Sequence, residues 1–190
     1  MSKIALSGNA SGTGTLTLSA PNTNSDRTLT LPDNSGTLLS NASTFAGTGP
    51  AFSAYSNATT TLTSANTAYK IPFQIAEFDT ASCYDNATNY RFTPNVAGYY
   101  QVTAILGCGA VASNYFQSVV FKNGSRFTDL INFPTSASAG PVLGGGTLMY
   151  MNGTTDYIEI YAQSSAAGAV VYGSNVGART MFQAFLARAA

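Results

Sequence analysis

Short runs of alternating apolar and polar residues, separated by Asn-Gly, Gly and Pro, extend over residues 51–190 and constrain the fold more than any other feature. A period of two residues is the signature of a β-strand, and Asn-Gly supplies the positive φ angles of a tight hairpin turn. No segment shows a convincing helical period. The sequence therefore predicts an all-β fold, an antiparallel β-sandwich or jelly roll of about eight to ten strands.

Two pairs of strands are expected to form hairpins, because each pair is joined through Asn-Gly. The first hairpin comprises 116–121 and 126–131 around Asn123-Gly124, and the second comprises 147–151 and 157–161 around Asn152-Gly153. A glycine run at 144–146 is expected to bend the backbone before a strand, and it is no phosphate loop because no Lys-Ser/Thr follows it. Further strands are expected at Ala51–Tyr55, Tyr69–Phe73, Tyr90–Phe92, Tyr99–Leu106 and Met181–Leu186.

The chain has two regions of different composition. Residues 1–50 contain 28 Ser, Thr, Gly or Asn residues and one aromatic residue, Phe45, whereas residues 51–190 contain the other 21 aromatic residues. The change falls at Gly47-Thr48-Gly49-Pro50, where small residues meet a proline. We therefore expect a β-rich attachment or stem segment over 1–47 and a β-sandwich knob over 48–190.

The first region carries a weak repeat. Thr15-Leu16-Thr17-Leu18 and Thr28-Leu29-Thr30-Leu31 each alternate threonine with leucine, and turn-forming residues lie between them. This pattern predicts a short β-hairpin or two successive strands. The segment has too few leucines to bury a hydrophobic core of its own. We therefore expect further copies of the chain, or a larger assembly, to complete that core.

The charge content excludes several functions. Eight Lys and Arg balance eight Asp and Glu, and charged residues make up 8% of the chain. Nucleic-acid binding needs clustered basic residues, so we expect none. The chain has no His, which excludes Ser-His-Asp and Cys-His nucleophiles, and we expect no enzyme activity. No apolar run is long enough for a membrane span or a signal peptide, so we expect synthesis in the cytoplasm of a cell without export.

We also expect no metal and no other cofactor. Asp79 and Asp85 lack the ligand spacing of a calcium loop. Cys83 and Cys108 are 25 residues apart, with no second pair to suggest a zinc ribbon. Two buried thiols are the expected state, and a disulfide is the alternative in an oxidising exterior.

Aromatic residues occupy strand faces that a monomer would expose to water. In 156–162, Ile158, Ile160 and Ala162 form one face, whereas the other carries Glu159 between two tyrosines. The strand from residue 99 to 106 likewise has two largely apolar faces. Charge-poor aromatic surface is typical of interface cores, which predicts contact between subunits; a monomer with a few exposed tyrosines is the alternative. The candidate interface residues are Tyr99, Tyr157 and Tyr161.

Four segments together resemble the globular head of the complement C1q family, a branch of the tumour-necrosis-factor-like jelly rolls. In that resemblance Gly98 allows a tight entry into the strand that follows. The resemblance covers about residues 50–188 and implies a compact homotrimer. The segments are Pro50-Ala51-Phe52-Ser53-Ala54, residues 84–100, residues 146–160, and Thr180-Met181-Phe182-Gln183-Ala184-Phe185-Leu186.

The region before the knob contains no collagen-like Gly-X-Y repeat. It is instead similar to segments of tailed-phage fibre and appendage proteins, which implies a virion. We therefore expect a homotrimeric short fibre whose 1–47 segment contacts other virion proteins and whose knob contacts a host-surface glycan or protein. The alternatives are a capsid decoration protein or head fibre that clamps the capsid, and a soluble carbohydrate- or protein-binding module.

Overall fold

The structure is a computed structural model that describes residues 49–109, 112–135, 140–173 and 180–190, with isolated positions between residues 11 and 28. The chain divides into two units, 1–38 and 39–190, and the fold below is that of the second. The two predicted N-terminal strands, 15–18 and 28–31, lie largely outside the described residues. They stay predictions, as does the boundary at residue 47.

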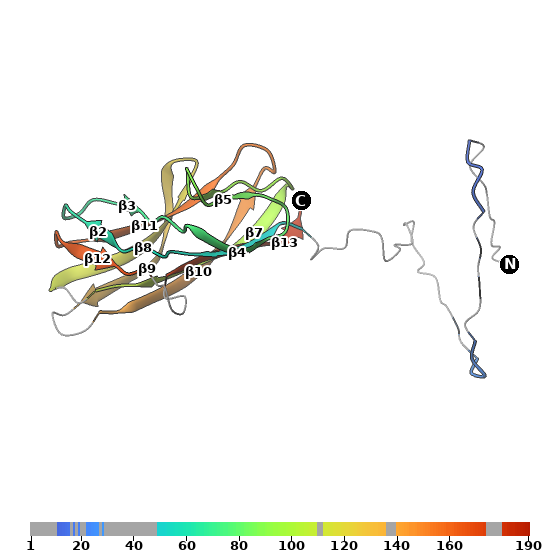
Figure 1. The fold of residues 1–190 in the computed structure, drawn as a ribbon, viewed down its shortest axis with the longest axis horizontal. Helices are drawn as coiled ribbons and strands as arrows, with labels where there is room; N and C mark the ends of the chain where they lie inside the picture. Colours follow the sequence, from blue (N-terminus) through green and yellow to red (C-terminus); the bar gives the residue numbers. More distant parts are fainter. Residues whose placement is uncertain are drawn as a thin grey trace. The chain divides into compact units, whose positions relative to one another are not determined.

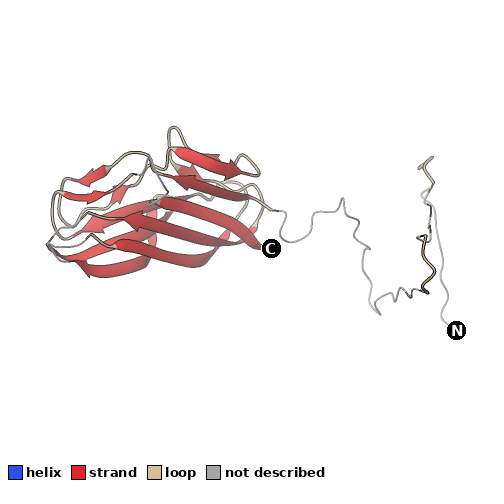
Figure 2. Cartoon of the chain, turned by 60° about the horizontal axis from the view of Figure 1, so that its bottom comes forward, coloured by secondary structure: helices blue, strands red, loops and turns tan. Residues whose placement is uncertain are grey.

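The described residues form an all-β sandwich, as predicted (Figures 1 and 2). The first sheet has the order β10-β7-β13-β1-β4, and its neighbouring strands are antiparallel. The second sheet has the order β5-β6-β11-β8-β9, with β3 also paired to β11, and β12 pairs with β2 in a small ribbon. The strands are β1 (Ala51–Tyr55), β2 (Thr60–Leu62), β3 (Tyr69–Lys70), β4 (Ile75–Asp79), β5 (Tyr84–Asp85), β6 (Arg91–Phe92), β7 (Gly98–Gly107), β8 (Ser113–Lys122), β9 (Ser125–Thr135), β10 (Val142–Met151), β11 (Ile158–Ser164), β12 (Ala169–Val171) and β13 (Met181–Ala189).

Alternation along the strands determines which side chains enter the core. On β11, the inward residues are Ile158, Ile160 and Ala162, and all three are fully buried, as the sequence predicted. On β7, Tyr100, Val102, Ala104 and Leu106 are likewise fully buried, and residues 99, 101, 103 and 105 face outward. The core therefore lies between two sheets whose inner faces are both aliphatic and aromatic.

An aromatic cluster joins the two sheets. The ring of Phe52 on β1 stacks on Tyr84 at 4.5 Å and on Phe92 at 4.6 Å, measured between ring centroids. Phe182 on β13 meets Phe52 edge-on at 4.8 Å. Offset stacks and edge-to-face pairs are the favourable geometries for aromatic rings. This cluster couples β1 and β13 of the first sheet to β5 and β6 of the second.

The two predicted hairpins have different outcomes. Asn123-Gly124 joins β8 to β9 as predicted, with φ angles of 53° and 76° and Lys122 paired to Ser125. The hairpin at Asn152-Gly153 was wrong, because β10 pairs with β7 in the first sheet and β11 pairs with β8 in the second. Residues 152–157 instead cross from one sheet to the other.

At two positions another part of the backbone lies so close that only glycine, which has no Cβ, fits. A Cβ at Gly98 would lie 2.4 Å from the carbonyl oxygen of Arg188, which confirms the expected tight entry into β7. The predicted bend at 144–146 was wrong, because these glycines lie within β10. A Cβ at Gly145 would lie 2.6 Å from the carbonyl oxygen of Leu130. The missing side chain at this position of β10 therefore allows β9 to approach it closely.

Both ends of the described domain lie at the same end of the sandwich (Figure 1). The backbone N–H of Leu186 donates to the carbonyl of Pro50, and the N–H of Ala190 donates to Ala97. We call this the terminal end. The opposite end, which carries the β2–β12 ribbon, is the distal end.

Candidate subunit interface

The outer face of the first sheet gathers large apolar side chains. Strand register places Tyr99 on β7 opposite Tyr150 on β10, and the two rings meet at 5.6 Å between centroids. One step along the sheet, Gln101 lies opposite both Leu148 and Phe185. Residues opposite one another in adjacent strands share a face, so these side chains form one surface.

These side chains are half exposed although they are large and apolar. The exposed fractions are 45% for Tyr99, 55% for Leu148, 44% for Tyr150, 51% for Phe185 and 52% for Phe78 on β4. Soluble monomers seldom expose several large apolar side chains on one sheet face, and such a surface marks an interaction site. We call these five residues the apolar face.

Few charged groups accompany the apolar face. Among the described residues of these five strands, Glu77 and Arg188 are the charged side chains that point outward. Gln183 Nε2 donates to Ser53 Oγ at 3.0 Å, and Ser53 Oγ donates to Glu77. These bonds meet part of the hydrogen-bonding capacity of the three groups, so a neighbouring subunit that covers them has to supply further partners for the Glu77 carboxylate.

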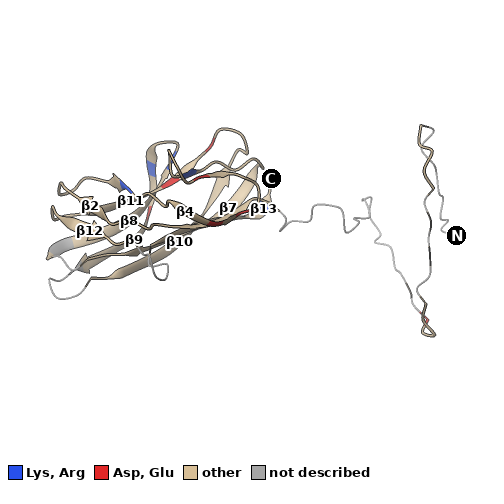
Figure 3. Cartoon of the chain, in the orientation of Figure 1, with Lys and Arg blue, Asp and Glu red and all other residues tan. Residues whose placement is uncertain are grey.

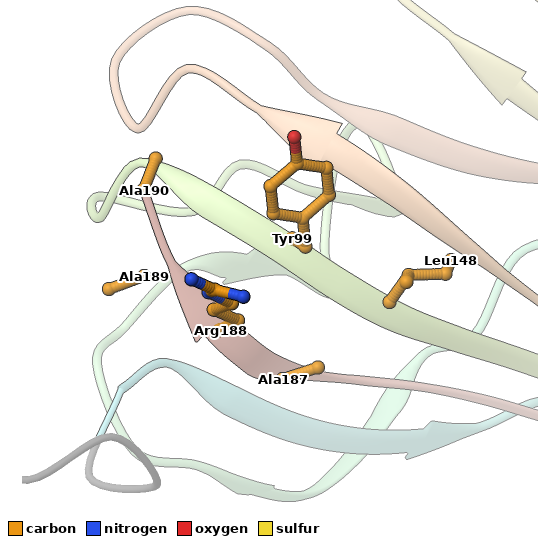
Figure 4. Close-up of a pocket in the computed structure, with 6 residues that line it drawn as sticks. All are labelled: Tyr99, Leu148, Ala187, Arg188, Ala189 and Ala190. Carbon is orange, nitrogen blue, oxygen red and sulfur yellow. The ribbon is translucent and has the colours of Figure 1, made fainter.

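A shallow, open cavity of about 600 Å³ lies at the terminal end of this face (Figure 4). Tyr99 and Leu148 line one side, and the last residues of the chain, including Arg188, line the other. The cavity continues the apolar face and has one cationic group, so it is a hollow in the same surface rather than an enclosed ligand site.

The outer face of the second sheet has a different character. The guanidinium of Arg91 lies 4.5 Å from the ring centroid of Tyr157, and Tyr161 stacks on Phe121 at 3.9 Å. Burial, followed by the nearby carboxylate of Glu159, raises the pKa of Tyr161 to about 12. The tyrosines of this face are therefore covered by partners within the same domain.

Ion pairs and amides cover the rest of that face. Lys70 Nζ pairs with Glu159 Oε1. Arg126 pairs with Asp129 and donates to Gln117 at 3.0 Å and to Gln163 at 2.8 Å. A charged and internally bonded surface is expected of a sheet face in contact with water.

The structure does not bring the three predicted interface residues together. Tyr99 lies on the apolar face, whereas Tyr161 lies on β11 of the second sheet and Tyr157 directly precedes that strand. It instead joins Tyr99 to Phe78, Leu148, Tyr150 and Phe185, four residues that sequence reasoning did not select. Their alternation with buried neighbours was visible in the sequence, but the pairing of β7 with β10 and β13 was not.

The acidic residues considered for metal binding have structural partners. Asp79 accepts backbone hydrogen bonds from Ala81 and Tyr84. Hydrogen bonds from the backbone of Thr88 and Ala87 lower the pKa of Asp85 to about 2. Within the described residues, no group of three or more Cys, Asp or Glu side chains could hold a metal ion. The same residues contain no helix with the length and apolar character needed to cross a membrane.

Cys83 and Cys108 are buried, separate thiols, and burial raises the pKa of both, to about 12 for Cys108. The thiolate is the reactive form of cysteine. We therefore expect neither thiol of the folded protein to react with an aromatic disulfide reagent at pH 8, whereas both react at once in denaturant. Absorbance of the released thiolate measures this, and rapid reaction of the native protein would contradict it.

Comparison with known proteins rests on structure. No family model matches the sequence, and no curated protein matches it. The globular domain of zebrafish complement 1qA has a TM-score of 0.53 and 16% identity, covering 74% of this chain and 99% of its own. Murine APRIL has a TM-score of 0.53 and 12% identity, covering 72% of this chain and 97% of its own. The PRD1 vertex protein P5 has a TM-score of 0.49 and 16% identity over 73% of this chain and 97% of its own, a score too low to support an inference.

These likenesses agree with the two-sheet topology and with the segments that resemble the complement C1q head. Structural similarity at such low sequence identity shows the fold and not the binding partners. The C-terminal part of this chain therefore has the jelly-roll fold that the complement 1qA globular domain and APRIL share.

Proposed function

We propose that this chain is a non-enzymatic structural protein of a tailed-phage virion, in which three copies assemble through their apolar faces. The observation that carries the self-association is the apolar face itself. The phage context is supported by the resemblance of the N-terminal segment to fibre and appendage proteins.

Burial of the apolar face favours association energetically. Covering the exposed half of each large side chain contributes about 1 kcal/mol, so five of them contribute several kcal/mol per subunit. The second sheet offers a smaller gain, because its exposed Phe127 and Phe133 accompany ion pairs that would lose water on burial. A closed ring of three copies joins two different patches of each subunit, and in this proposal the apolar face of the first sheet supplies one of them while the outer face of the second sheet stays in solvent.

The distal end is suited to contact a host surface. The described domain begins at its terminal end, at residue 49, so in this proposal the distal loops point away from the particle. Among the described residues, the distal loops 56–59, 63–68, 108–109, 140–141 and 165–168 contain no charged residue, and Figure 3 shows no charge on the β2–β12 ribbon. An uncharged glycan or protein surface is the matching ligand class.

Part of the distal end is held rigidly. Asn66 accepts a hydrogen bond from Tyr115 Oη at 2.6 Å, and Gln163 Nε2 donates to the same hydroxyl at 3.1 Å. The hydroxyl of Tyr69 accepts from the backbone N–H of Ser64 at 2.8 Å. A preformed loop loses little entropy on binding, and three identical loops add their weak contacts through effective concentration.

Particle assembly tests this proposal. Phage lacking the protein would be complemented with the full chain or with residues 46–190, and particles would be labelled with an antibody against the knob. We expect label on the tail with the full chain, and a folded but unincorporated knob with the deletion. Label on the capsid lattice would favour the decoration alternative, and absence from particles would favour the soluble binding module; either would contradict the fibre proposal.

A further inference from the structure

The two Asn-Gly pairs have a chemical liability that the fold has to control. In Asn-Gly, the backbone nitrogen of glycine can attack Cγ of the asparagine side chain, since glycine has no Cβ to hinder the approach. A new N–Cγ bond forms, the Cγ–Nδ2 bond breaks and ammonia leaves. Water then opens the resulting succinimide to aspartate or isoaspartate. The reaction needs a side-chain amide that is free to rotate.

The side-chain amide of Asn123 is fixed at both ends. Its Nδ2 donates to Asp156 Oδ1 at 2.8 Å, and its Oδ1 accepts from the backbone N–H of Tyr157 at 2.9 Å. Attack by Gly124 would require both hydrogen bonds to break, because Cγ has to turn toward the backbone. The turn thus holds its own side chain away from the reaction.

Asn152 is fixed in a different way. Its Oδ1 accepts from the backbone N–H groups of Thr154 and Thr155, both at 2.9 Å, and of Asp156 at 3.0 Å. Its Nδ2 donates to the hydroxyl of Thr155 at 2.8 Å. This is the local turn that carries the chain from the first sheet to the second.

Asp156 connects the two turns. Besides the contact with Asn123, its Oδ2 accepts from the backbone N–H of Asn152 at 3.0 Å and pairs with Lys122 Nζ at 2.9 Å. The residue is 8% exposed. Burial by itself raises the pKa of Asp156, but the hydrogen bonds from Asn123 and Lys122 outweigh burial and lower it. The group is therefore a carboxylate at neutral pH.

We propose that Asn123 and Asn152 are latent deamidation sites and that Asp156 keeps both unreactive by holding their turns together. Deamidation at Asn123 would place a second carboxylate against that of Asp156, 2.8 Å from its Oδ1 in the present geometry. An isoaspartate would also lengthen the backbone of a two-residue turn. Modification at this position therefore loosens the β8–β9 hairpin and the crossing to β11 together.

Peptide mapping by mass spectrometry tests the proposal. The full chain would be incubated at pH 7.4 in its native state and in urea, and amide-to-acid conversion would be measured at each Asn-Gly. We expect the native chain to react at both sites slower than the unfolded chain by about tenfold or more, the ratio that a local opening equilibrium imposes. Asp156→Ala should accelerate the native reaction at both Asn123 and Asn152 by a similar factor.

Three further variants separate this role from general stability. Thr155→Ala removes one partner of Asn152 and should accelerate reaction at that site alone. Asp129→Ala removes an exposed carboxylate of β9 that contacts neither asparagine, and should change neither rate. Met149→Ala destabilises the buried core without touching the turns. Equal deamidation rates at Asn123 in Asp156→Ala and in an equally destabilised Met149→Ala protein would overturn the proposal. An unchanged deamidation rate at Asn152 in Thr155→Ala would also overturn it.

Discussion

Replacing both Leu148 and Phe185 by glutamate is expected to convert the proposed trimer into folded monomers. The two side chains flank Gln101 in the middle of the apolar face and are about half exposed in the single chain. Neither contributes to the core, so the sandwich should remain. In a trimer each carboxylate would be buried without a partner, which costs several kcal/mol per site and exceeds the gain from the remaining apolar contacts.

Sedimentation velocity would measure the change, and circular dichroism would confirm that the sheet content is kept. The matched control is the double variant Phe127→Glu/Phe133→Glu, which places the same two charges at side chains that are 49% and 46% exposed on β9 of the second sheet. We expect this control to stay trimeric. Dissociation of the control, or a trimeric double variant, would place the subunit contact elsewhere.

Replacing Phe52 by alanine is expected to cause a large loss of folding stability. Phe52 is 1% exposed and contacts Tyr84, Phe92 and Phe182 through stacked and edge-on rings. Removing a buried phenylalanine costs about 3–5 kcal/mol, since packing contacts are lost and a cavity remains. A domain of this size has a free energy of unfolding of about 5–15 kcal/mol, so this one change removes a large part of it.

Urea unfolding at a fixed protein concentration would measure the loss, because stability depends on concentration when copies associate. Phe127→Ala is the matched control, since it deletes the same ring from an exposed site and should shift stability by about 0.5 kcal/mol or less. A loss below about 1 kcal/mol for Phe52→Ala would contradict the central role of the aromatic cluster.

Local patterns predicted local structure well and long-range pairing poorly. Asn123-Gly124 forms the expected turn because both residues adopt positive φ and the flanking strands pair directly. At Asn152-Gly153, only the glycine has positive φ, and the asparagine side chain caps a longer turn. The same dipeptide therefore supports either a hairpin or a sheet-to-sheet crossing, and its sequence alone does not distinguish them.

The same limit applies to the interface. Alternation assigned residues 99–106 and 156–162 to inward and outward faces correctly, because the period of two follows from strand geometry. It could not show that the two outward faces lie on opposite sheets. Among the described residues, no cation stacks on the ring of Tyr99 and no carboxylate bonds its hydroxyl, whereas Arg91 lies over the ring of Tyr157 and Tyr161 contacts Glu159. Those partners come from the tertiary fold, and strand alternation in the sequence does not reveal them.

The molar mass of the purified full chain in solution tests the central claim most directly. Multi-angle light scattering should give three times the 19.6 kDa of one chain, independent of dilution through the micromolar range. A mass of one chain at the same concentrations would contradict the account, because the apolar face would then be exposed to water without a partner.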